Sequence, residues 1–114
     1  MKIISKKNNI IVVKKLIIAD NPISRTIGLL LKKSFEAGEG LLIKPCNSIH
    51  SHFMRFSFDA VFLDKENKIV YLIKQMSPWK ISPIIRSAYS ILEIPSGTAA
   101  IHNLEINDVL EILE

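Results

Sequence analysis

The stretch AVFLDKENKIVYLIKQM, from Ala60 to Met76, decides the fold of this chain. Two apolar runs, Ala60–Leu63 and Ile69–Met76, flank the polar segment DKENK. Ile, Val, Phe and Tyr fit the pleated surface of a sheet, and Asn67 is the turn residue that most easily takes a positive φ. The stretch therefore predicts a β-hairpin closed by a tight turn.

Similar short apolar runs recur along the chain between turn residues, which is typical of an antiparallel sheet or barrel. We expect further strands at residues 10–18, 40–44, 49–56, 90–94 and after a turn at 107–108, with a bulge or bend at Lys14-Lys15. The run ADNPISRTIGLLLKK, residues 19–33, predicts a helix, because its apolar residues recur at helical spacing. A shorter helix is expected after Pro95, with Ser96 as its cap.

These elements predict an α+β fold that is mainly β. We expect an antiparallel β-barrel or sandwich of about seven strands, with one N-terminal-side helix and one short helix. The segment Lys44–Lys68 should supply two central strands. No strand–helix–strand alternation is found, so no parallel pairing is expected. A length of 114 residues fits a single domain, residues 1–114.

The charge of the chain argues against a nucleic-acid partner. The net charge is +4, but twelve of the 15 cationic residues are lysines, whereas nucleic-acid recognition favours arginine. One cysteine excludes an internal disulfide and fits a reducing compartment. No secretory leader is recognised and no apolar run approaches about 18 residues, so we expect a cytoplasmic protein without a membrane span.

Cys46, His50 and His52 are candidate metal ligands, since thiolate and imidazole suit zinc or copper. On a strand the two histidines would point to the same face. Only His102 remains as a further histidine, and the spacing matches no zinc motif. We therefore expect neither a metal nor another cofactor.

Cys46 is also a candidate nucleophile, because His50 and Asp59 complete a Cys-His-acid set. Against this interpretation, Cys46 has no adjoining glycine-rich oxyanion turn, and a lone cysteine is more often a small buried apolar residue. The residues alone assign no reaction, and a hydrolase or transferase using Cys46 or His50 stays an alternative.

A polar pocket is the third hypothesis. Its residues are polar or amphipathic and stand in apolar surroundings: His50, Arg55, Asp59, Trp79, Arg86 and Glu93. The arginines would hold a small polar or anionic ligand. In the structural alternative, Glu93 pairs with Arg55 or Arg86 inside the fold, and Asp59 accepts backbone N–H groups at the Phe56–Phe58 bend.

The sequence also resembles an uncharacterised family, the domain of unknown function one-nine-two, over roughly residues 19–110. The matching residues form a specific set: Arg25, Gly28, Leu29, Gly38, Glu39, Gly40, Ser48, Ile49, His50, Phe53, Met54, Asp59, Phe62, Leu63, Asp64, Leu92, Glu93, Pro95 and Gly97. Departures from the family pattern are Ser57, Asn67 and Asn107. The resemblance implies a compact, mainly antiparallel β domain with a helix in its N-terminal part, and it implies no activity.

We therefore expect a non-enzymatic small-molecule-binding or accessory module with a polar pocket. The competing functions are an enzyme that uses Cys46 or His50, and a protein-interaction module whose partner the sequence does not identify.

Overall fold

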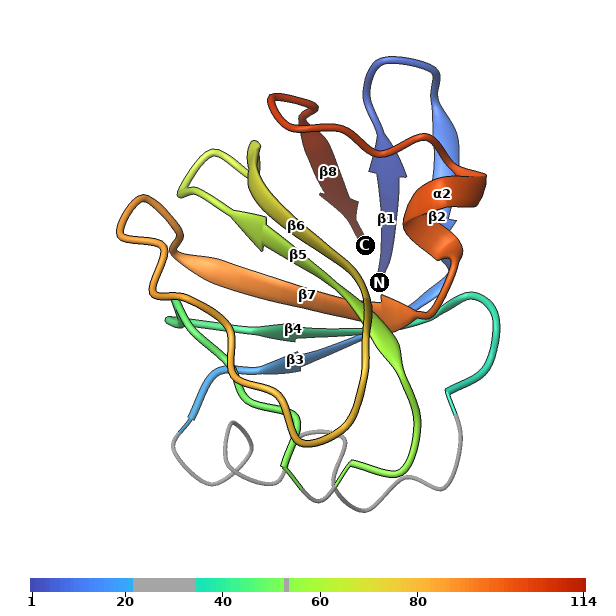
Figure 1. Cartoon of the computed structure of the whole chain (residues 1–114). Coiled ribbons are helices and arrows are strands. Elements are labelled where there is room, and N and C mark those ends of the chain that lie inside the picture. Colours follow the sequence, from blue (N-terminus) through green and yellow to red (C-terminus); the bar gives the residue numbers. More distant parts are fainter. Residues whose placement is uncertain (22–34, 53) are drawn as a thin grey trace.

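The computed structural model describes residues 1–21, 35–52 and 54–114 (Figure 1). This part of the chain holds eight strands and one short helix. They are β1 (Lys2–Ser5), β2 (Ile10–Val13), β3 (Lys15–Ala19), β4 (Glu39–Ile43), β5 (Phe58–Leu63), β6 (Ile69–Met76), β7 (Ser90–Pro95), α2 (Thr98–Ile101) and β8 (Leu110–Leu113). No helix in these residues is long and apolar enough to cross a membrane.

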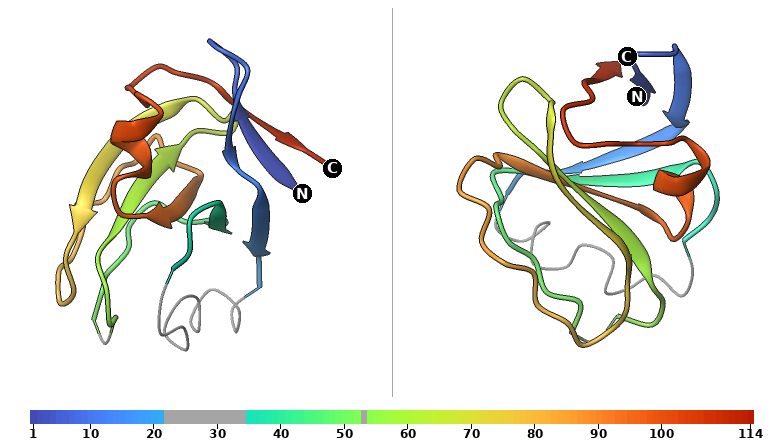
Figure 2. Two further views of the ribbon diagram at one scale, coloured as in Figure 1. Left: turned by 90° about the vertical axis from the view of Figure 1, so that its right-hand side faces the viewer. Right: turned by 45° about the horizontal axis from the view of Figure 1, so that its top comes forward.

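The strands form two sheets. The smaller has the order β2-β1-β8, and the larger has the order β3-β4-β7-β5-β6. Within the described residues neither sheet closes into a barrel, so the mainly β fold is an open sandwich. The chain ends lie side by side, because β1 pairs antiparallel with β8 and Lys2 faces Leu113 (Figure 2).

The predicted hairpin is confirmed as β5 and β6. Asn67 closes its turn with a φ of 62°, and the Asp64 carboxylate accepts the N–H groups of Glu66 and Lys68. The predictions for β4, β7, the short helix and the C-terminal strand are also confirmed. Each of these elements follows from local residue type, which explains why the sequence alone located them.

Three predictions were wrong. The run of residues 10–18 bends at Lys14, as expected, but it forms two strands that belong to different sheets instead of one long strand. The described residues of the range 49–56, all except 53, form no strand, and His50 makes one isolated bridge to Ile81. The described part of Lys44–Lys68 therefore supplies one central strand instead of two. β3 pairs with β4 in parallel, although no parallel pairing was expected from a sequence without strand–helix–strand alternation. The helix expected at 19–33 falls largely on residues 22–34, outside the described residues.

The larger sheet buries both faces. Alternate residues of β5 and β7, such as Val61 and Leu92, face the smaller sheet and pack with Ile3, Val13 and Leu110. The other residues, such as Phe58, Phe62 and Ile91, form a second apolar cluster on the opposite face. Met54 belongs to this second cluster, and Ile49, Phe56 and Ile85 pack against it. Loop residues therefore cover the face turned away from the smaller sheet.

Candidate functional site

Two loops run side by side over the second apolar cluster, and we call them the paired loops: the described residues 44–52 and 54–57, and residues 77–89 (Figures 1 and 2). Backbone hydrogen bonds join them at several points. Ser82 N–H donates to the Ile49 carbonyl and Ile85 N–H donates to the Asn47 carbonyl. The loops are therefore tied to each other almost like strands, although the pairing is too irregular to count as a sheet.

Ser51 is the centre of this pairing and is fully buried. Its hydroxyl donates to the Ser77 carbonyl at 2.6 Å and accepts the Lys80 N–H at 2.8 Å. Its backbone N–H donates to the Lys80 carbonyl, and its carbonyl accepts the Trp79 N–H. The residue between His50 and His52 is consequently fixed in place.

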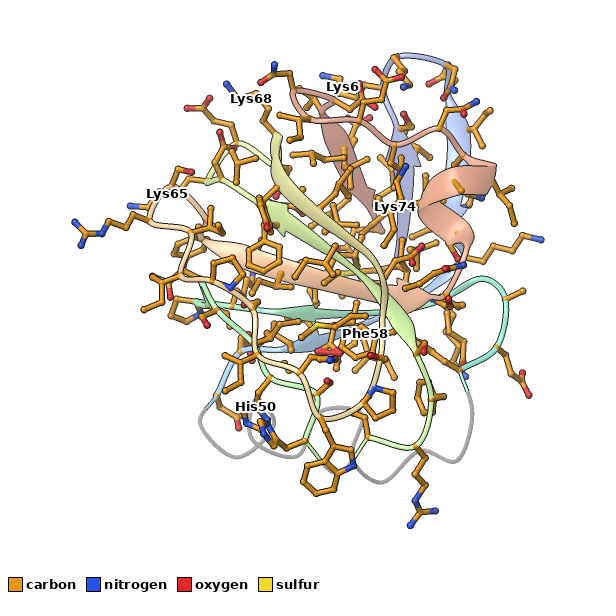
Figure 3. All side chains as sticks on the ribbon, in the orientation of Figure 1. Lys6, His50, Phe58, Lys65, Lys68 and Lys74 are labelled. Carbon is orange, nitrogen blue, oxygen red and sulfur yellow. The ribbon has the colours of Figure 1, made fainter. Side chains whose placement is uncertain are left out.

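His50, His52 and Trp79 form a chain of ring contacts that we call the aromatic cluster. The ring centroids of His50 and His52 are 5.1 Å apart, and those of His52 and Trp79 are 5.4 Å apart. Trp79 keeps 58% of its surface exposed and has a φ of 66°, a conformation that costs a non-glycine residue energy. Figure 3 shows His50 at the opposite end of the molecule from Lys6 and Lys68.

Glu93 is a buried carboxyl on the face of the larger sheet that the paired loops cover. Strand alternation places it on the same face as Ile91, and its neighbours across the strands are Leu41 of β4 and Ala60 of β5. Only 6% of its surface is exposed, and no hydrogen bond or ion pair to its carboxyl is found in the described part of the chain. Burial in apolar surroundings raises the pKa of Glu93 to about 8.

Asp59 is fully buried too, but its carboxylate is fully used by the fold. Oδ1 accepts the N–H of Gln75, and Oδ2 accepts the N–H groups of Gly97 and Ala99. Gln75 has a positive φ at an irregular point of the β5–β6 register, and Gly97 and Ala99 begin α2. Asp59 therefore joins β5, β6 and α2, and the donors are not those of the Phe56–Phe58 bend that the sequence suggested.

Arg55 and Arg86 are both exposed. Neither forms the expected ion pair with Glu93, although all three residues lie in the described part of the chain. The internal pairing predicted as the structural alternative for Glu93 is therefore wrong. The Cys46 thiol is partly buried and donates to the Ser48 carbonyl at 3.1 Å.

The six residues predicted to line one pocket are thus distributed over several places. His50 and Trp79 belong to one cluster, joined through His52. Asp59 and Glu93 lie on opposite faces of the larger sheet, since Asp59 pairs with Ile94 and Glu93 pairs with Ala60. The predicted set omitted His52, although the alternation His50-Ser51-His52 signalled a shared face, and it omitted Ser51, for which the sequence held no signal.

The fold and these residues define a small, mainly β sandwich. It has a buried carboxyl that finds no partner among the described residues, and a histidine–tryptophan cluster on its paired loops. The chain belongs to the family DUF192, described as "Uncharacterized ACR", whose model matches residues 3–112.

Relatives of the same uncharacterised kind are found in archaea. A UPF0127 protein of Pyrococcus abyssi is 33% identical over 85% of this chain and 85% of its own length. A UPF0127 protein of Pyrococcus horikoshii is 38% identical over 70% of this chain and 71% of its own length.

A solved structure with the same fold comes from Sinorhizobium meliloti and is described as a "putative transcription regulator". Its TM-score is 0.79 at 19% identity, over 96% of this chain and 89% of that one. A protein of unknown function from Novosphingobium aromaticivorans has a TM-score of 0.77 at 17% identity, over 85% of this chain and 74% of its own. These similarities establish the fold.

Proposed function

We propose that the protein is a non-enzymatic binding module that holds a small molecule on the sheet face around Glu93, beneath the paired loops. The observation that carries this function is a carboxyl group buried among apolar residues without a partner in the described chain. Burying a polar group without a hydrogen bond is costly, and the fold makes no visible use of this one. A ligand that bonds to the carboxyl would offset that cost.

The surroundings of Glu93 define the chemistry of such a ligand. Leu41 and Ala60 flank it on the neighbouring strands, and Phe62 and Ile91 share its face. Ala60, the neighbour on β5, has a small apolar side chain. The ligand would therefore have an apolar body that packs on the aliphatic and aromatic side chains.

The protonation state of Glu93 determines which polar group the ligand would carry. With a pKa raised to about 8 by burial, the carboxyl is mostly neutral at pH 7. A neutral carboxyl offers one O–H donor and one carbonyl acceptor. A carboxamide or a carboxylic acid matches both, and an amine is bound by the ionised form. His50, Trp79, Arg55 and Arg86 lie nearer the surface, where the arginines would attract an anionic ligand group.

A thermal-shift screen tests this function. Small molecules with an apolar body and a carboxamide, carboxylate or amine would be screened against the native protein, Glu93→Gln and Glu93→Leu. The matched control is Glu111→Gln, which changes an exposed glutamate on β8. Compounds that bind at the proposed site raise the melting temperature of the native and control proteins and fail to raise that of Glu93→Leu.

Glu93→Gln separates the two kinds of ligand. Glutamine retains a donor and an acceptor, so binding of a carboxamide should persist, whereas binding of an amine should be lost with the charge. Equal shifts in native protein and Glu93→Leu, confirmed by calorimetric titration, would place the ligand elsewhere and refute the proposed site.

A further inference from the structure

His50 and His52 stand on either side of a residue that the fold holds rigidly. Ser51 is fully buried, and its hydroxyl and backbone bond to the opposite loop at Ser77, Trp79 and Lys80. Both imidazoles project from this anchored point, with their ring centroids 5.1 Å apart. His50 is exposed and His52 is partly buried, so the space next to the rings is open to solvent.

The separation of the rings matches two imidazoles that share one metal ion. An ion held at about 2.0–2.1 Å from an imidazole nitrogen lies about 3.2 Å from the ring centroid. Two rings whose centroids are 5.1 Å apart then enclose an angle of about 106° at the ion, close to the tetrahedral value of about 109°.

The imidazole nitrogens are available for this role. In the described part of the chain no hydrogen bond to either ring is found, so no protein donor there competes with a metal for an imidazole lone pair. The described residues also bring no third histidine, cysteine or carboxylate to the pair. The remaining coordination positions would be filled by water or by an external ligand, which makes the ion exchangeable.

We propose that His50 and His52 form a surface binding site for a late first-row transition-metal ion, with Cu²⁺ bound most tightly. Imidazole suits Zn²⁺, Cu²⁺ and Ni²⁺, and affinity for a given nitrogen site generally increases from Ni²⁺ to Cu²⁺ and decreases again at Zn²⁺. The sequence alone argued against a metal because it lacks a third ligand. The fixed placement of two ligands next to each other changes that conclusion. This site is separate from the sheet face around Glu93 and is independent of any ligand bound there.

The chain contains its own reporter for this site. Trp79 is the single tryptophan, and its ring centroid lies 5.4 Å from that of His52. Cu²⁺ and Ni²⁺ quench tryptophan emission at short range. Titration of the native protein with Cu²⁺ at pH 7.5 should therefore give a saturable loss of Trp79 fluorescence with one ion bound per chain.

Four variants decide whether the two histidines hold the ion. His50→Ala and His52→Ala should each weaken Cu²⁺ binding at least about tenfold, as loss of one of few ligands does. His102→Ala removes the third histidine of the chain, and Cys46→Ser removes the thiol; both should leave the titration unchanged. Calorimetric titration with Ni²⁺ and Zn²⁺ repeats the comparison without depending on the fluorescence of Trp79.

Circular dichroism melting of each variant verifies that it is folded, and His50→Gln provides a second variant if an alanine variant is unstable. Native-like affinity in both His50→Ala and His52→Ala would overturn the site. The same holds if Cys46→Ser or His102→Ala abolishes the quenching, or if native protein shows no saturable quenching.

Discussion

Asp59 and Glu93 are two buried carboxyl groups on adjacent strands of one sheet, and they differ in the hydrogen-bond donors that surround them. Asp59 on β5 accepts three backbone N–H groups, from Gln75, Gly97 and Ala99. Glu93 on β7 faces an apolar cluster and has no partner in the described chain. The first carboxyl joins three elements of the fold, whereas the second is expected to lower the stability of the fold, because it is buried without a described partner.

This contrast shows that burial alone does not mean that a polar residue stabilises the fold. The free energy of a buried carboxyl depends on its donors, since charge-assisted hydrogen bonds offset the loss of hydration. A residue that costs stability and supports no contact is the better candidate for function. Four measurements test the contrast.

The largest effect is expected for Asp59→Ala. It leaves three backbone N–H groups without their acceptor, and bonds to a charged group contribute about 1.5–3 kcal/mol each. The free energy of unfolding from urea titration should fall by about 5 kcal/mol. Glu111→Ala, on the exposed side of β8, is the control and should change it by less than about 0.5 kcal/mol. A small effect of Asp59→Ala would show that water replaces the carboxylate easily.

The second effect is the pH dependence caused by Glu93. Its pKa is raised from 4.5 to about 8 by burial, so between these values the native state holds a proton that the unfolded state has released. The contribution of Glu93 to the free energy of unfolding is therefore fully present below pH 4.5 and is lost as the pH rises towards 8. Between about pH 5 and 7.5 the contribution should fall by about 3 kcal/mol.

Urea titrations across this pH range, made on native protein and Glu93→Gln, check the pH dependence. The difference between the two proteins isolates Glu93, because other ionisable groups are common to both. If the two curves remain parallel from pH 5 to 7.5, Glu93 is already charged in the native state and has a partner.

The third effect has the opposite sign to the first. Glu93→Leu replaces a carboxyl that has no partner among the described residues with an apolar side chain of similar size beside Leu41 and Phe62. The free energy of unfolding at pH 7.5 should rise by about 2 kcal/mol, as is common when a buried polar group without full compensation is replaced by an apolar residue. A decrease in stability would mean that Glu93 supports the fold in the same way as Asp59.

The smallest effect is expected for Ser96→Ala. The sequence suggested Ser96 as the cap of α2, but its side chain is exposed, and the first N–H groups of the helix donate to Asp59. The change in unfolding free energy should stay below about 0.5 kcal/mol, whereas loss of a capping serine typically costs about 1 kcal/mol. A loss of that size in urea titration would assign part of the capping to Ser96.

Local chemistry made much of the fold predictable. The β5–β6 hairpin follows from two β-favouring runs and from Asn67, which tolerates the left-handed conformation. The turn at Asn107-Asp108 located the C-terminal strand in the same way. The burial of Glu93 was also predictable, because it stands between large aliphatic residues in the run SILEIP.

Other features depend on residues far apart in the chain. Ile49, Met54 and Phe56 are apolar because they cover the sheet from a loop, and local pattern does not distinguish such a loop from a strand. The parallel pairing of β3 with β4 cannot be predicted from either strand alone, because it depends on which strands meet in the folded sheet. The same is true of the contact between His52 and Trp79, which lie on different loops.

The sequence by itself determined the mainly β character of the chain, its hairpin and the presence of polar residues within apolar segments, because these depend on residue type and on neighbours along the chain. Only the tertiary structure decided what those polar residues do. Donors for Asp59 come from residues 16 to 40 positions away, and none of the described residues offers one to Glu93. The environment that determines whether a buried charge is stabilised forms only when distant strands are packed together.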